Sequence, residues 1–146
     1  MIIILLGITV MILCLGVQGV CVGAVIYYYA RASRRPLGSR PYAEAYDTLV
    51  RIMVLLLFAG MLQMAVWAFL YRMLGQFEDF ETALYFSGVT FTSLGYGDFT
   101  LTGRARMLAP MEASDGLMMF GVTSAVFMIA LQHAINRSLG LPTRKQ

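Results

Sequence analysis

Residues 92–98 read Thr-Ser-Leu-Gly-Tyr-Gly-Asp, and this stretch decides how the rest of the chain is arranged. Gly95 and Gly97 flank one aromatic residue, and glycine adopts backbone conformations that residues with a Cβ resist. An alternating backbone of this kind points successive carbonyl oxygens to one side, where they can replace the water shell of a cation. A helix-like run from Asp79 to Thr90 precedes the segment, and a long apolar stretch lies on each side of this unit.

This unit resembles part of a known family. Residues Ala83 to Asp98 are similar to the pore helix and selectivity filter of potassium channels, whose filter usually reads T-V-G-Y-G-D. The resemblance covers Thr48 to about Arg137 and implies a small prokaryotic-type channel with one extra N-terminal span. It implies passive potassium conduction through a homotetrameric pore, with K⁺ as the permeant ion, no enzymatic activity and no organic cofactor.

The resemblance also implies a role for each filter residue. The Ser93 hydroxyl and four backbone carbonyls are the expected potassium ligands, and these carbonyls belong to Ser93, Leu94, Gly95 and Tyr96. Three further residues are expected to support the filter: Thr92, Gly97 and Asp98. The Tyr96 ring should brace the filter against the pore helices.

Three positions depart from the family pattern. Ser93 replaces the commoner threonine, and Leu94 replaces valine, so we expect changes in the innermost ion site and in the packing behind the filter. Phe86 stands where a tryptophan often bonds the filter tyrosine, and the sequence leaves open whether Tyr85 compensates.

The composition places the chain in a bilayer. Hydrophobic residues make up 59% and charged residues 13%, whereas soluble domains have about 45–50% and about 25%. We expect an all-α membrane protein whose three transmembrane helices cover residues 1–30, 48–74 and 111–136. A re-entrant pore helix (79–91) and the filter (92–98) complete the pore domain, 48–137, because an irregular backbone survives at membrane depth only inside protein or beside water. A cytoplasmic loop (31–47) and a short cytoplasmic tail (138–146) complete the predicted organisation.

Charge placement predicts the orientation. Basic residues gather between or beside the first two spans, at Arg31, Arg34, Arg35, Arg40 and Arg51, and after the third span, at Arg137, Arg144 and Lys145. The positive-inside tendency then places the N-terminus outside and the C-terminus in the cytoplasm, in a bacterial or archaeal plasma membrane. The basic loop is suited to anionic lipid head groups, whereas the scattered basic residues do not indicate nucleic-acid binding.

The third span resembles the pore-lining inner helix of the same family. Gly116 and Gly121 match the places where that helix bends and narrows, although close packing is an alternative role for such glycines. With the bend at Gly116, helical spacing directs four side chains towards the cavity: Leu117, Phe120, Ser124 and Met128. We hypothesise that Phe120 and Met128 form apolar constrictions that gate by dewetting.

Three of the polar residues within the predicted spans carry a specific prediction. Glu112 and Asp115 have two interpretations: salt bridges with Arg104 or Arg106 around the pore mouth, or sites that modulate ion entry or gating. Gln63 is expected to hydrogen-bond a neighbouring helix rather than contact an ion.

The sequence leaves three rivals to a potassium-selective channel. These are a weakly selective monovalent cation channel, a potassium transporter subunit built from pore loops, and a non-conducting membrane scaffold. The single repeat with both glycines argues against the transporter.

Overall fold

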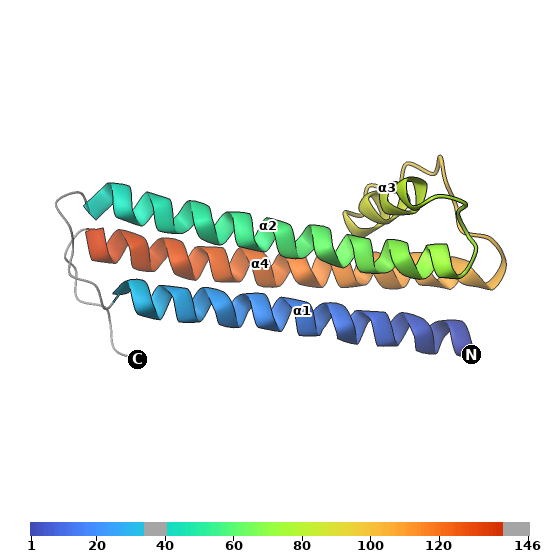
Figure 1. Cartoon of the computed structure of the whole chain (residues 1–146), viewed down its shortest axis with the longest axis horizontal. Coiled ribbons are helices and arrows are strands. Elements are labelled where there is room, and N and C mark those ends of the chain that lie inside the picture. Colours follow the sequence, from blue (N-terminus) through green and yellow to red (C-terminus); the bar gives the residue numbers. More distant parts are fainter. Residues whose placement is uncertain (34–40, 139–146) are drawn as a thin grey trace.

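The computed structural model describes residues 1–33 and 41–138, and every regular element in these residues is helical. Three long helices lie side by side: α1 (Ile2–Ser33), α2 (Pro41–Met73) and α4 (Leu108–Ser138) (Figure 1). Helices α1 and α4 run in the same direction, and α2 runs opposite to both. The short helix α3 (Phe80–Phe91) lies at the end of the bundle that holds the N-terminus. A 3-10 helix, η1 (Gly103–Met107), leads directly into α4.

Each long helix contains a stretch that is long and apolar enough to cross a membrane. These stretches are Ile2–Tyr28, Ala43–Met73 and, with η1 included, Gly103–Asn136. Large apolar side chains such as Ile12, Leu57 and Phe58 are exposed, as expected for surfaces that contact lipid or another chain. The predicted fold class, an all-α membrane protein with three spanning helices, is confirmed.

The helices are longer than the sequence analysis predicts. Helix α1 continues to Ser33 and α2 begins at Pro41, so the predicted loop is helical over 31–33 and 41–47. Proline is favoured in the first turn of a helix, where its missing N–H has no partner to lose. Helix α4 begins at Leu108 rather than 111, which places Pro110 in its first turn. The predicted loop residues 34–40 and tail residues 139–146 lie outside the described residues.

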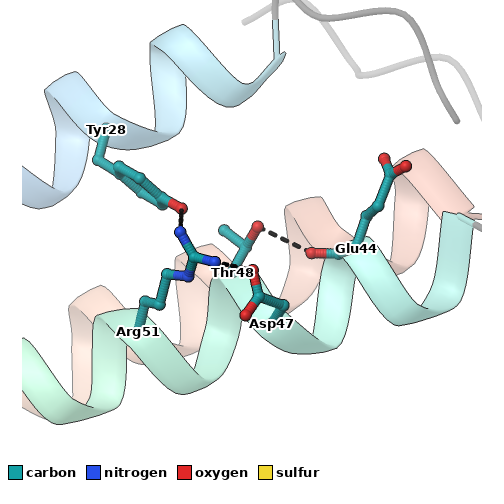
Figure 2. A network of polar contacts seen from close by, with 5 residues as sticks. All are labelled: Tyr28, Glu44, Asp47, Thr48 and Arg51. Carbon is teal, nitrogen blue, oxygen red and sulfur yellow. Dashed lines mark hydrogen bonds and ion pairs between the residues drawn. The ribbon is translucent and has the colours of Figure 1, made fainter.

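A polar network between α1 and α2 supports the early start of α2 (Figure 2). The Thr48 hydroxyl donates to the Glu44 carbonyl oxygen at 2.9 Å, and Arg51 forms an ion pair with Asp47 at 2.7 Å. The second terminal nitrogen of Arg51 donates to the Tyr28 hydroxyl at 3.3 Å. Because the ion pair is exposed, it contributes little stability. The network nevertheless joins α2 to the end of α1.

The buried side chains form two apolar clusters along the bundle. The larger cluster surrounds α3 and includes Trp67, Tyr71, Phe91 and Leu108, all nearly or fully buried. The smaller cluster lies further along the three long helices and consists of Val25, Ile52, Leu56 and Ala130. The bundle is therefore packed most extensively where α3 lies against it.

A polar contact joins the three long helices between these clusters. The Gln63 side-chain amide donates to Gln18 Oε1 at 2.9 Å, and the Gln18 amide donates to the Thr123 hydroxyl at 3.2 Å. Both glutamines are buried. The prediction that Gln63 hydrogen-bonds a neighbouring helix is confirmed. Since apolar helices gain little from contacting one another in lipid, such bonds help to fix which faces meet.

We expect Gln18→Leu to destabilise the folded chain by about 1 kcal/mol, because the buried side chain of Gln63 and the half-buried hydroxyl of Thr123 lose their partner. Thermal unfolding in detergent measures the effect. Gln132→Leu is the matched control, since Gln132 is exposed on α4. Equal unfolding temperatures for the two variants would contradict a stabilising role for the Gln18 contact.

Candidate functional site

Asp79 begins helix α3. Its carboxylate oxygens accept hydrogen bonds from Thr82, one from the backbone N–H at 2.7 Å and one from the hydroxyl at 2.8 Å. Asp79 is therefore the N-cap of α3. These bonds favour the ionised carboxylate and lower the pKa of Asp79. The cap is thus fully formed at neutral pH and is lost only as the pH falls through that lowered value.

Helix α3 is too short to cross a bilayer. Its 12 residues span roughly 18 Å, whereas the hydrocarbon core is about 30 Å thick. Its buried side chains include Ala83, Phe86 and Phe91, which pack within the large cluster. The carboxyl end of a helix carries a partial negative charge. Helix α3 therefore presents this end to the segment that follows Phe91.

The backbone after α3 folds back on the helix in a specific way. The N–H groups of both Leu94 and Gly95 lie near the Val89 carbonyl oxygen, at N···O distances of 2.9 and 3.3 Å. In a trans peptide the carbonyl points opposite to the N–H of the next residue, and no peptide bond in the described residues is cis. The carbonyls of Ser93 and Leu94 consequently point away from α3, towards the same side.

The backbone conformation alternates along this segment. Ser93, Gly95 and Gly97 have φ angles of 61°, 58° and 78°, whereas Leu94 and Tyr96 do not have positive φ. Positive and negative φ angles thus alternate from Ser93 to Gly97. Gly95 and Gly97 therefore occupy the left-handed region that glycine adopts without steric cost. The left-handed conformation of Ser93 was missed, and it costs about 1–2 kcal/mol for a residue with a Cβ.

All residues from Thr92 to Thr100 are exposed in the single chain. The Tyr96 side chain, which the sequence analysis expects to brace the filter, is 67% exposed. The segment thus leaves both its carbonyl oxygens and its aromatic ring uncovered by its own chain.

The Asp98 side chain is hydrogen-bonded to a residue of α3. The Tyr85 hydroxyl donates to Asp98 Oδ2 at 2.7 Å, and this hydrogen bond to a carboxylate raises the pKa of Tyr85. The Tyr85 and Phe99 rings also meet edge to face at a centroid distance of 5.9 Å. This bond ties Asp98 to α3. Tyr85 bonds Asp98, whereas Phe86 packs among the rings of Tyr71 and Phe77.

The two carboxylates of α4 are buried, and the predicted salt bridges with Arg104 or Arg106 are wrong. Glu112 accepts a hydrogen bond from the Tyr71 hydroxyl at 2.6 Å and also bonds the Ser87 hydroxyl. Asp115 accepts a hydrogen bond from the Trp67 indole N–H at 2.9 Å. The physical reason is that both carboxylates lie on the buried face of α4, where Glu112 meets α2 and α3 and Asp115 meets α2 and α1, whereas Arg104 and Arg106 are exposed on η1.

The sequence analysis missed the partners of these carboxylates. Trp67 and Tyr71 have the amphipathic character of residues at a membrane interface, yet both side chains are fully buried. The available signal was their spacing: Trp67 and Tyr71 lie four residues apart, and Glu112 and Asp115 lie three apart, so each pair shares a helix face.

Gly116 is a close-packing glycine in this structure. A Cβ built on Gly116 would lie 1.9 Å from the carbonyl oxygen of Phe91, the last residue of α3. Helix α4 continues through this position without a break. By contrast, a Cβ on Gly121 would have no heavy atom within 4 Å. Of the two roles that the sequence left open for Gly116, close packing therefore matches its surroundings.

The four predicted cavity-facing residues share an exposed face of α4. This face contains Leu117, Phe120, Ser124 and Met128. Phe120 and Ser124 also line a cavity of about 740 Å³ between α2 and α4, which reaches the end of α3 at Phe91. The face is therefore free of cover from α1 and α2.

Comparison with protein families agrees with this geometry. A family model described as "Ion channel" matches residues 50–133, which is more than half of the chain. This chain belongs to that ion channel family. Comparison with curated proteins and with solved structures gave no match. The matched region contains α3, the 92–98 segment and most of α2 and α4. The channel is thus a multi-pass membrane protein of ion transport, and α1 lies outside the matched region.

We expect Gly116→Ala to destabilise the channel by at least about 1–3 kcal/mol, because the new methyl group would overlap the backbone of Phe91. Thermal unfolding in detergent reports the loss. Gly121→Ala is the matched control on the same helix, where the methyl group enters open space and stability should be unchanged. Similar stabilities for both variants would show that α3 does not rest on Gly116.

Proposed function

We propose that this channel conducts K⁺ passively and selectively. The observation that carries the proposal is the backbone of residues 93–97, whose φ angles alternate in sign and whose Ser93 and Leu94 carbonyls point away from α3. Uncharged oxygen ligands of this kind suit a dehydrated monovalent cation. The ligand set would consist of the Ser93 hydroxyl and the carbonyls of Ser93, Leu94, Gly95 and Tyr96.

A single chain supplies oxygen ligands from only one side. Four copies around an axis would surround the ion, and the exposure of Thr92 to Thr100 supports this arrangement. In such a homotetramer the Tyr96 ring would pack against a neighbouring chain. The exposed α4 face that contains Leu117, Phe120 and Met128 would line the pore below the filter.

Two further features favour a cation at this position. The partially negative carboxyl end of α3 directly precedes the filter, so its field attracts positive charge. Asp98 is held by Tyr85 just beyond the last filter glycine, and its carboxylate would raise the local cation concentration at the mouth. The mechanism is therefore electrostatic and needs no chemical step.

The proposed orientation follows from the charge distribution. The filter and the N-terminus would face outward, and the residues after α1 and α4 would lie in the cytoplasm, in a bacterial or archaeal plasma membrane. The basic residues between α1 and α2 would contact anionic lipid. This placement puts the Asp98 end of the filter on the outer side.

Flux into liposomes that contain the purified channel should be high for potassium and rubidium and low for sodium and lithium. The reason is that rigid carbonyl rings match the larger dehydrated ions better. Reversal potentials measured in mixed potassium and sodium solutions also report the permeability of potassium relative to sodium. Equal flux of potassium and sodium would favour the weakly selective alternative, and no barium-sensitive flux at all would favour a scaffold.

We expect Gly95→Ala to abolish potassium flux, because alanine is strained at a φ of +58° and would displace the neighbouring carbonyls. Gly75→Ala is the matched control: Gly75 has a φ of +66°, and a Cβ at either glycine meets no atom within 4 Å. Both variants therefore carry a similar backbone strain of about 1–2 kcal/mol, but only Gly95 lies in the filter. If the two lose flux equally, the filter assignment is wrong.

A further inference from the structure

Two buried carboxylates lie behind the filter without a basic partner. Glu112 and Asp115 are fully buried and lie one turn apart on α4. The groups that face them are the Cys14 thiol on α1, Trp67 and Tyr71 on α2, and the Ser87 hydroxyl on α3. Within residues 1–33 and 41–138 neither carboxylate forms a salt bridge, and the η1 arginines are exposed. Two uncompensated charges side by side in this apolar surrounding would be very costly.

The hydrogen bonds of Ser87 show where a proton is needed. Its hydroxyl oxygen lies 2.8 Å from the Met64 carbonyl oxygen on α2 and also bonds Glu112 Oε1 on α4. A serine hydroxyl has one proton and can donate to only one of these two acceptors. If Ser87 donates to Met64, the bond to Glu112 requires a proton on the carboxyl group. A neutral Glu112 satisfies both contacts, and its other oxygen accepts from Tyr71.

We infer that Glu112 is a proton-binding site that ties the pore helix to both neighbouring helices. With the proton bound, Glu112 donates to Ser87 and Ser87 donates to Met64, so α3 is bonded to α4 and α2 at once. When the proton leaves, the Ser87 hydroxyl turns to the carboxylate and its bond to α2 is lost. The ligand of this site is the proton itself, and its release loosens the helix that carries the filter.

The predicted effect of Glu112 on potassium flux rests on the proposed function. Ionisation of Glu112 removes one hydrogen bond between α3 and α2. Its loss shifts the equilibrium between α3 bonded to α2 and α3 released from it by roughly five- to tenfold. Potassium flux should therefore fall roughly five- to tenfold once the pH on both sides is raised far enough to ionise Glu112.

Glu112→Gln tests this pH dependence. The glutamine amide can donate to Ser87 and its oxygen can accept from Tyr71, so the variant imitates the protonated acid and cannot titrate. Its flux should equal that of the wild type at low pH and stay high at high pH. Glu81→Gln is the control, because Glu81 is an exposed carboxylate on α3, and it should keep the wild-type pH dependence. A Glu112→Gln variant that retains this dependence would overturn the inference.

A second measurement keeps the test independent of ion conduction. The infrared carbonyl band of a protonated carboxylic acid should be present in the reconstituted wild type at low pH and decline at high pH. Asp115→Asn should retain this band, whereas Glu112→Gln should lose it. A band lost in Asp115→Asn instead, or absent from the wild type, would disprove a proton on Glu112. If the band behaves as expected while no variant passes potassium, the proposed function fails and the proton site stands.

Discussion

The contact between the end of α3 and Gly116 of α4 fixes the point at which the 92–98 segment begins. The Phe91 carbonyl oxygen lies where a Cβ on Gly116 would be, so the two helices approach as closely as their backbones permit. The filter backbone starts directly after this contact and folds back on Val89. Because each filter carbonyl is positioned through α3, a displacement of α3 on α4 would move every proposed ligand together. The absence of a side chain at Gly116 thus sets where α3 ends against α4 and where the proposed filter begins.

Hydrogen bonds, rather than apolar burial alone, determine how the helices face one another. In a bilayer an apolar face is equally well covered by lipid, so apolar contact discriminates weakly between alternative arrangements. The buried donors Trp67 and Tyr71 find their acceptors only when α2 and α4 are in one register. The Gln18 and Gln63 amides impose a similar restriction further along the bundle. Each unsatisfied group would cost about 1–3 kcal/mol, so these polar contacts select one packing among many.

The sequence predicted the features that depend on local pattern. Apolar length predicts the three spans, the helix-like run from Asp79 to Thr90 predicts α3, and the glycines at 95 and 97 predict an alternating backbone. Features that depend on which faces meet were not predicted. Glu112 was assigned to exposed arginines because a sequence does not reveal that its carboxylate faces Tyr71 and Ser87. The extra helical residues at the end of α1 and the start of α2 were not predicted. Hydropathy identifies the part of a helix that lies in the hydrocarbon core, whereas the helix itself continues beyond that core.

Helix α1, which lies outside the family match, packs along the same helix that carries Gly116. A Cβ on Gly7 would lie within 3 Å of the Met111 side chain, and Cys14, Gln18 and Val25 are buried further along α1. These positions are separated by seven, four and seven residues and therefore share one face of α1. At Gln18 this face is hydrogen-bonded to both α2 and α4. Since α1 contacts α4 near both ends of this face, tilting α4 would break contacts with α1. The additional helix consequently restrains the inner helix of the pore and is more than a membrane anchor.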